Sequence, residues 1–174
     1  RSLRYQTENV ANIWFDKDSM KNHIFLRPDK PFSKDHYQRV PDINGAFSVG
    51  IREGNDPNRD ADYAYVHFQL KYPEPILDGG LYIYGGLTEW QVKPEHRLEY
   101  NPRDRMYEGT MYLKQGYYNY QYIYLRDGET EGETELTEGS FRDARQIYTF
   151  YVYHQQMGDR YDRLIGHDII SSIF

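Results

Sequence analysis

Histidines are the residues of this sequence best suited to bind a metal ion or to transfer a proton, and there are six of them. No two histidines lie four residues apart, the spacing that places two ligands on one face of a helix. His67 and His154 fall in segments that the pattern predicts as strands, so a sheet can bring them together. A histidine on a sheet face is more often structural or solvent-facing. We therefore expect neither a metal site nor a cofactor.

The acidic residues also lack the spacing of known catalytic or metal-binding sites. Residues 128–140, GETEGETELTEGS, carry five glutamates without the DxDxDG pattern that wraps a calcium ion, and they are predicted to form a solvated loop. With 27 acidic residues, chance carboxylate pairs are certain, so their number does not support glycoside hydrolysis. The sequence has no cysteine, no GxSxG elbow and no GxxxxGK loop. We predict that the protein is not an enzyme.

Aromatic residues are the outlier of the composition, since 19 tyrosines raise the share of Phe, Trp and Tyr to 17%. Most of these rings are expected to form cross-strand pairs that stabilise sheet faces, although a tyrosine-rich surface also suits binding of a sugar or a protein. Trp90 is the leading binding candidate. It is either an exposed platform for a sugar ring or, in the preferred interpretation, a core anchor after a turn. The further candidates are Tyr82, Tyr84 and Tyr118.

The charge balance and hydropathy narrow the choice of partners. A net charge of −6 has the wrong sign for a phosphate-binding surface, so nucleic acid is not an expected partner. No stretch approaches the roughly 18 consecutive apolar residues of a membrane span, so we expect a protein that is not inserted in a membrane. No charged-then-apolar leader opens the sequence.

Short strands separated by glycine turns must position these residues. Residues 62–70 alternate, and we assign Ala64, Val66, Phe68 and Leu70 to the core. The Lys114–Gly116 segment is predicted to be a tight turn that joins residues 107–113 to 117–125 as a hairpin, with Gly116 supplying a positive φ. Tyr120 and Tyr122 should then pack inward. Further strands are predicted at residues 81–84 and 147–154.

The opening part of the sequence is less regular. Short strands are predicted at residues 9–15, 22–26 and 46–52, with a proline-rich loop over residues 27–44. The pattern predicts an all-β fold, an antiparallel β-sandwich over residues 59–174 with an irregular N-terminal arm over residues 1–58. We expect that this arm does not fold alone.

The turn GGLTEW and the run YNYQYIYLRDGE resemble the early-set immunoglobulin-like modules related to family-48 carbohydrate-binding modules. Trp90 matches the turn tryptophan of that family. Tyr118, Tyr120, Tyr122, Asp127 and Gly128 match its hairpin. This resemblance implies an immunoglobulin-like sandwich, with glucan or carbohydrate binding as an alternative function. Glycogen-binding members usually add a second tryptophan and a lysine on the sugar face, whereas this chain has no tryptophan after Trp90.

An ordered series of motifs covers nearly the whole chain: DINGAF, DADYAYVHFQL, YIYGGLTEW, LKQGYYNYQY, TEGSF and DRYDRLIG. The series is similar to the type IX secretion system plug proteins of Bacteroidota, a family long catalogued as a domain of unknown function. The resemblance implies an exported periplasmic protein that closes the outer-membrane translocon of this pathway. It also implies a missing N-terminal half, with residues 1–58 as the junction, and a signal peptide that is not present in this chain. We therefore predict a non-enzymatic periplasmic protein-binding module.

Overall fold

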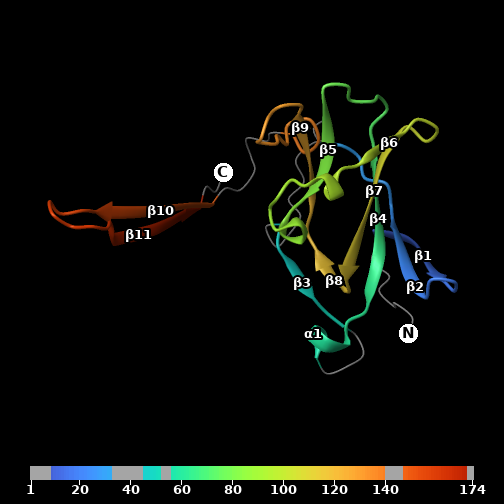
Figure 1. The fold of residues 1–174 in the computed structure, drawn as a ribbon, viewed down its shortest axis with the longest axis horizontal. Helices are drawn as coiled ribbons and strands as arrows, with labels where there is room; N and C mark the ends of the chain where they lie inside the picture. The colour runs from blue at the N-terminus through green and yellow to red at the C-terminus, as the bar shows by residue number, and fades with distance from the viewer. Residues whose placement is uncertain (1–8, 33–44, 52–55, 140–146, 172–174) are drawn as a thin grey trace. The chain divides into compact units, whose positions relative to one another are not determined.

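Strands make up nearly all of the regular structure (Figure 1). The computed structural model describes residues 9–32, 45–51, 56–139 and 147–171. These residues form two compact units, and the first of them contains β1 to β9. Within it lie a four-residue helix, α1 (Pro57–Asp60), and two 3-10 turns, η2 (Gly86–Thr88) and η3 (Pro94–His96). No helix in the described part of the chain is long and apolar enough to cross a membrane.

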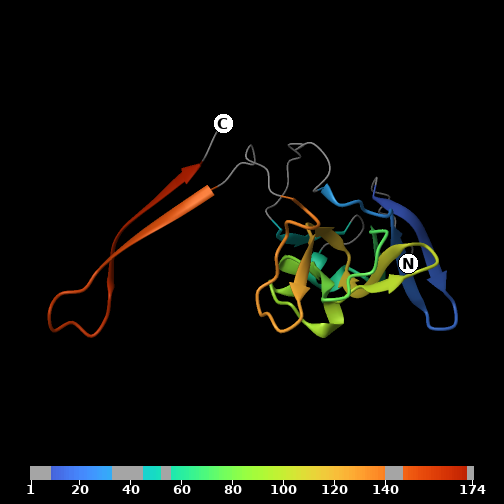
Figure 2. The ribbon, with the colours of Figure 1, turned by 90° about the horizontal axis from the view of Figure 1, so that it is seen from above.

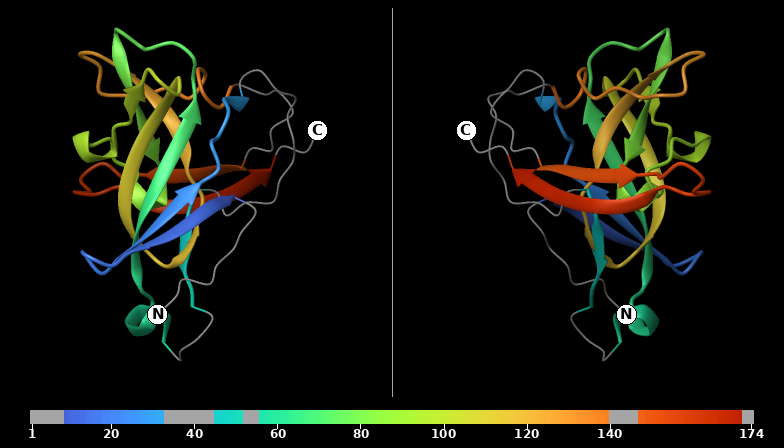
Figure 3. Two further views of the ribbon diagram at one scale, coloured as in Figure 1. Left: turned by 90° about the vertical axis from the view of Figure 1, so that its right-hand side faces the viewer. Right: turned by 90° about the vertical axis from the view of Figure 1, so that its left-hand side faces the viewer.

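The larger layer of the first unit is a five-stranded sheet in the order β1-β2-β4-β7-β6. Figure 3 shows β1, β2 and β4 side by side. The strands are β1 (Val10–Asp16), β2 (Lys21–Leu26), β4 (Tyr63–Lys71), β6 (Glu99–Asn101) and β7 (Met106–Lys114). All neighbours are antiparallel except β2 and β4, which pair in parallel with Ile24 opposite Val66. A parallel pair needs a long connection, and the chain between β2 and β4 provides one.

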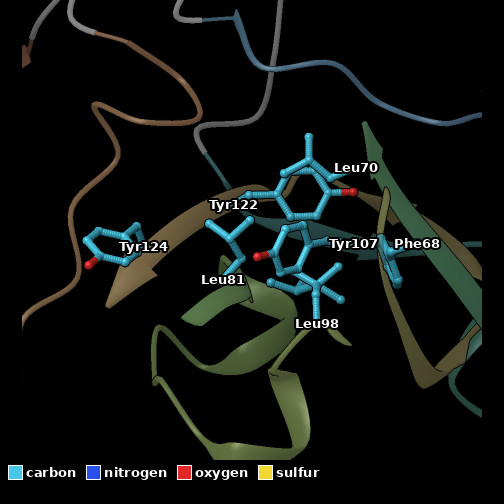
Figure 4. Packing of buried hydrophobic residues seen from close by; sticks show 8 residues of the cluster. Phe68, Leu70, Leu81, Leu98, Tyr107, Tyr122 and Tyr124 are labelled. Carbon is cyan, nitrogen blue, oxygen red and sulfur yellow. The ribbon is translucent and has the colours of Figure 1, made fainter. Parts of the chain in front are cut away.

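Two strand pairs form the opposite layer. One pairs β5 (Gly79–Tyr84) with β9 (Gln121–Arg126), and the other pairs β3 (Phe47–Val49) with β8 (Gly116–Tyr118), both antiparallel. Apolar side chains from β4, β5, β7 and β9 meet between the layers, as Figure 4 shows. The arrangement confirms the predicted all-β fold, a β-sandwich. The buried cluster consists of Phe68, Leu70, Leu81, Ile83, Leu98, Tyr107, Tyr122 and Tyr124.

The alternation of β4 is as predicted. Ala64, Phe68 and Leu70 are buried, and Val66 packs against the same cluster. Tyr122 is also buried as expected, with 3% of its surface exposed. The ring of Tyr120 meets Phe68 edge to face, at 4.9 Å between centroids, so this tyrosine also points inward.

The predicted hairpin of residues 107–113 and 117–125 is wrong. β7 pairs with β4 and β6, whereas β9 pairs with β5 in the opposite layer, so the chain changes layers near Gly116. Gly116 is not required for a positive φ. A Cβ at this position would lie 2.5 Å from the carbonyl oxygen of Ser48, so glycine permits the close approach of β8 to β3.

The second unit contains one antiparallel hairpin, β10 (Ile147–His154) with β11 (Arg163–Ser171). Figure 2 shows the two strands running together over their length. The register shifts once, between Val152 and Tyr153. This hairpin belongs to the second compact unit, whereas β1 to β9 belong to the first.

The N-terminal arm is also more regular than predicted. β1 and β2 are the strands expected near residues 9–15 and 22–26, and they extend the main sheet instead of standing apart from it. The expected strand at residues 46–52 appears as the shorter β3. Most of the proline-rich loop predicted over residues 27–44 lies outside the described residues.

We predict that Tyr122→Ala lowers the free energy of unfolding by about 3 kcal/mol or more, because truncation of a buried aromatic side chain leaves a cavity in the core. Urea denaturation measured by circular dichroism would give this value. Tyr112→Ala is the matched control, since this tyrosine is 53% exposed, and its cost should stay below about 1 kcal/mol. A cost below about 1 kcal/mol for Tyr122→Ala would contradict the burial of this ring.

Candidate functional site

The side of the five-stranded sheet that faces away from the core carries a continuous group of aromatic side chains, which we call the outer face. Strand alternation places them there, because the core takes the intervening residues of β2, β4 and β7. Neighbouring strands are in register, so that Trp14 lies opposite His23, His23 opposite Tyr65, and Tyr65 opposite Tyr112. The outer face consists of Trp14, His23, Phe25, Tyr63, Tyr65, His67, Thr110 and Tyr112.

These rings stack on one another across the strands. Phe25 and His67 are nearly parallel, with centroids 4.3 Å apart and planes 7° apart. Tyr65 lies 5.2 Å from His23 and 4.8 Å from Tyr112, which continues the row across β7. Trp14 and Tyr112 nevertheless remain 51% and 53% exposed. The result is a packed aromatic surface whose rings hold each other in place while their outer edges reach solvent.

Lysines border the outer face. The Nζ of Lys21 donates a hydrogen bond to the hydroxyl of Tyr65 at 2.9 Å and lies 4.9 Å from the centroid of its ring. The Nζ of Lys114 lies 5.7 Å from the ring centroid of Tyr63. Although the chain is acidic as a whole, this surface therefore places positive charge next to aromatic rings.

The two histidines of the outer face are hydrogen-bonded to each other. His23 Nδ1 lies 2.9 Å from His67 Nε2, and His67 Nδ1 lies 2.9 Å from Thr110 Oγ1. Burial lowers the pKa of His67, and the nearby His23 lowers it further. The His67 imidazole is therefore favoured in its neutral form. His67 thus meets His23, while His154 belongs to β10 of the second unit. Among the described residues, no three potential metal ligands cluster.

Trp90 borders a pocket of about 270 Å³ in the first unit. The ring of Tyr84 meets Trp90 edge to face, with centroids 5.5 Å apart. Asn119 and Gln121 line the same pocket, so amide groups that donate and accept hydrogen bonds stand beside two aromatic rings. Trp90 is 50% exposed and lies outside the core cluster, which contradicts the preferred interpretation that it is a core anchor.

The backbone at this pocket is unusual. Glu89 and Trp90 both have positive φ, 54° and 57°, a conformation that costs a residue with a Cβ roughly 1 kcal/mol or more. The preceding turn is fixed by Thr88, whose buried hydroxyl donates to the carbonyl of Gly85 at 3.0 Å. The ring of Trp90 also lies so close to Gly45 that a Cβ there would clash with it. These constraints hold the indole in one place at the rim of the pocket.

The other two predicted binding residues lie elsewhere. Tyr118 stacks on Phe47 at 5.4 Å, and its hydroxyl donates a hydrogen bond to the carbonyl of Lys114, so it serves the β3–β8 pair. Tyr82 lies opposite Ile123 in the β5–β9 pair and bridges to Arg97. Neither residue lines the Trp90 pocket, so only Trp90 and Tyr84 of the four candidates come together.

A half-buried carboxylate connects the N-terminal arm to the core. The hydroxyls of Tyr120 and Tyr122 both donate hydrogen bonds to Asp29 Oδ2, at 2.8 and 2.7 Å. Burial raises the pKa of Asp29, against the opposing effect of these two hydrogen bonds. Burial raises the pKa of both tyrosines as well, so their hydroxyls stay protonated as donors. Glu138, whose pKa burial also raises, accepts a hydrogen bond from the backbone N–H of Tyr122.

Comparison with known proteins finds a solved structure similar to this chain, and that structure has no assigned activity. No family model and no curated protein matches the chain. A crystal structure of a hypothetical protein from Parabacteroides merdae matches 98% of this chain, with 36% sequence identity and a TM-score of 0.86. The match covers 42% of that protein, so this chain spans less than half of its length.

Asp29→Asn should flatten the dependence of stability on pH. Because the folded pKa of Asp29 is raised, its contribution to stability is fully present below the unfolded value near 3.8 and is lost as the pH rises through the folded value. The variant lacks this loss, so its stability relative to wild type should increase as the pH rises from about 4 to 7. Urea melts at several pH values would measure the change.

Asp127→Asn provides the control for the loss of one negative charge, because the Asp127 side chain is exposed. If the difference between wild type and Asp29→Asn stays constant over this pH range, the carboxyl of Asp29 is not titrating in the way that its burial implies.

Proposed function

We propose that this chain is a non-enzymatic protein-binding module of the periplasm and part of a plug that closes the outer-membrane translocon of the type IX pathway. The ordered motif series supports this role. The single structural observation that carries the protein-binding part is the outer face, where exposed aromatic rings are aligned across four strands.

The outer face suits a protein partner better than a sugar. A sugar ring stacks on the flat face of an aromatic ring, whereas here Phe25, His67 and His23 turn their flat faces toward each other. A protein surface can pack against the exposed edges and contact several rings together. Tyrosine and tryptophan give large contact areas with little rotamer entropy to lose, and the strands behind them hold the rings in place.

The proposal predicts that Trp14→Ala combined with Tyr112→Ala weakens binding to the translocon by at least 10-fold, about 1.4 kcal/mol, because two exposed rings of the outer face are lost. Copurification of the translocon with the full-length protein, followed by a binding titration, would measure this. Tyr117→Ala is the matched control, since Tyr117 is equally exposed, at 53%, but belongs to β8 in the opposite layer. Deletion of the gene should increase envelope permeability, and unchanged permeability and secretion would refute the plug role.

A specific observation favours a second candidate function, which is binding of a carbohydrate at the Trp90 pocket. Trp90 is half exposed, so a sugar ring can reach its indole and stack on it. Asn119 and Gln121 supply amides that match the paired hydroxyls of a sugar. The ring of Trp90 is held rigidly by Gly45 and by the η2 turn, which lowers the entropic cost of binding.

Titration with maltooligosaccharides tests this candidate. In a Trp14→Phe background, which leaves Trp90 as the sole tryptophan, we expect a fluorescence change and a heat signal, both abolished by Trp90→Ala. Tyr82→Ala, outside the pocket, should bind like the parent. If maltooligosaccharides leave fluorescence and heat unchanged, the pocket is not a glucan site.

A further inference from the structure

The β10–β11 hairpin exposes large apolar side chains along both strands. In β10 they are Ile147, Tyr148, Phe150, Tyr151, Val152 and Tyr153, and in β11 they are Leu164, Ile165, Ile169 and Ile170. Each of these ten side chains is at least 47% exposed. A two-stranded hairpin is marginally stable at best in water, because it has no core of its own.

Both faces of the hairpin are apolar. Tyr148, Phe150 and Val152 alternate with Ile147 and Tyr151, so β10 presents large side chains on each side of the strand. β4 differs, because its core side is apolar while its other side carries tyrosine, histidine and glutamine. A short continuous apolar run bounded by turns is typical of a strand that is covered on both faces.

Because both faces are apolar, the kinds of surface that can cover the hairpin differ in how much of it they bury. A second copy of the hairpin packed face to face would cover one face and leave the other in water. A second copy paired edge to edge would cover neither face. A surrounding domain that closes on both sides of β10 would remove the apolar side chains of both faces from solvent.

The polar residues of β11 indicate which strand of the hairpin lies deeper in the covering domain. His167 lies opposite Tyr151, and Asp168 lies opposite Phe150, so both faces carry a polar group in the middle of β11. The middle of β10 has no charged side chain. We therefore place β10 deeper in the covering domain than β11.

We propose that the β10–β11 hairpin inserts into an apolar cleft of a second domain of the same polypeptide. The Parabacteroides merdae chain is long enough to supply that domain, because more than half of it lies outside the match with this chain, while the match itself includes 98% of this chain. The inference goes beyond the proposed function and does not depend on the translocon or on the outer face.

Hydrogen–deuterium exchange tests the insertion. We expect the amides of residues 147–154 to exchange rapidly in this chain alone. The matching amides of the full-length Parabacteroides protein should exchange at least 100-fold more slowly, because the hairpin is covered there. Rapid exchange in the full-length protein would overturn the proposal. Strong protection in this chain alone would also overturn it, whether independent of concentration, as when its own first unit covers the hairpin, or dependent on concentration, as when a second copy does.

Two substitutions in the full-length protein separate insertion from docking on one face. Serine at the positions matching Phe150 and Tyr151, tested one at a time, should each increase exchange of the hairpin at least 10-fold, because the two side chains lie on opposite faces of β10. An effect of one substitution without the other would contradict coverage on both faces. Serine at the position matching Trp14, on the outer face, is the control that should leave hairpin exchange unchanged.

Discussion

The carboxylate of Asp29 is the interaction on which the arrangement of the first unit depends. It accepts hydrogen bonds from Tyr120 and Tyr122, and both tyrosines belong to the layer opposite β4. The backbone around Asp29 also pairs with β4, since its N–H donates to the carbonyl of Gln69 and its carbonyl accepts from Lys71. One residue thus joins the N-terminal arm, the main sheet and the tyrosine-rich strand. A carboxylate away from water is costly unless it is hydrogen-bonded, and two hydroxyl donors reduce that cost. Because Asp29 lies three residues after the end of β2, its anchoring holds β2 beside β4, and the outer face extends across β2 to β1.

The parts of the fold that depend on local pattern could be predicted from the sequence. The alternation in β4 identifies Phe68 and Leu70 as core residues, because side chains of a strand alternate whatever its partners are. The partner of each strand was not predictable in this way. The segment KQG resembles a hairpin turn, but Gly116 is selected by the approach of β3, which lies more than 60 residues earlier in the chain. A local turn signal cannot distinguish a hairpin from a crossing between layers, since both need a compact residue at the bend.

The candidate sites also differ in whether a local sequence pattern or the pairing of distant strands forms them. Trp90 could be identified as a binding candidate because its turn, GGLTEW, consists of six consecutive residues. Whether its ring is exposed could not be predicted from this motif. The outer face was not found, because Trp14, His23, Tyr65 and Tyr112 come from four strands and become neighbours only through their register. The parallel pairing of β2 with β4 determines that register, and no sequence pattern predicts this pairing. The signal that was available is the run of aromatic residues and histidines on the polar side of each strand, where an ordinary solvent-facing strand carries charged residues.

The outer face and the hairpin expose aromatic residues under different physical conditions, and this difference determines what each can do. Behind the outer face lies a packed core, so its rings can stay in water without cost to the fold, and a partner can bind and leave. The hairpin has no core of its own, and both of its faces carry large apolar side chains. A reversible partner would leave the apolar faces of the hairpin exposed for much of the time, which promotes aggregation. A permanent neighbour in the same polypeptide avoids this exposure, because its effective concentration is high and its contact is always present. The two surfaces therefore suit different roles, the outer face a transient partner and the hairpin a structural joint.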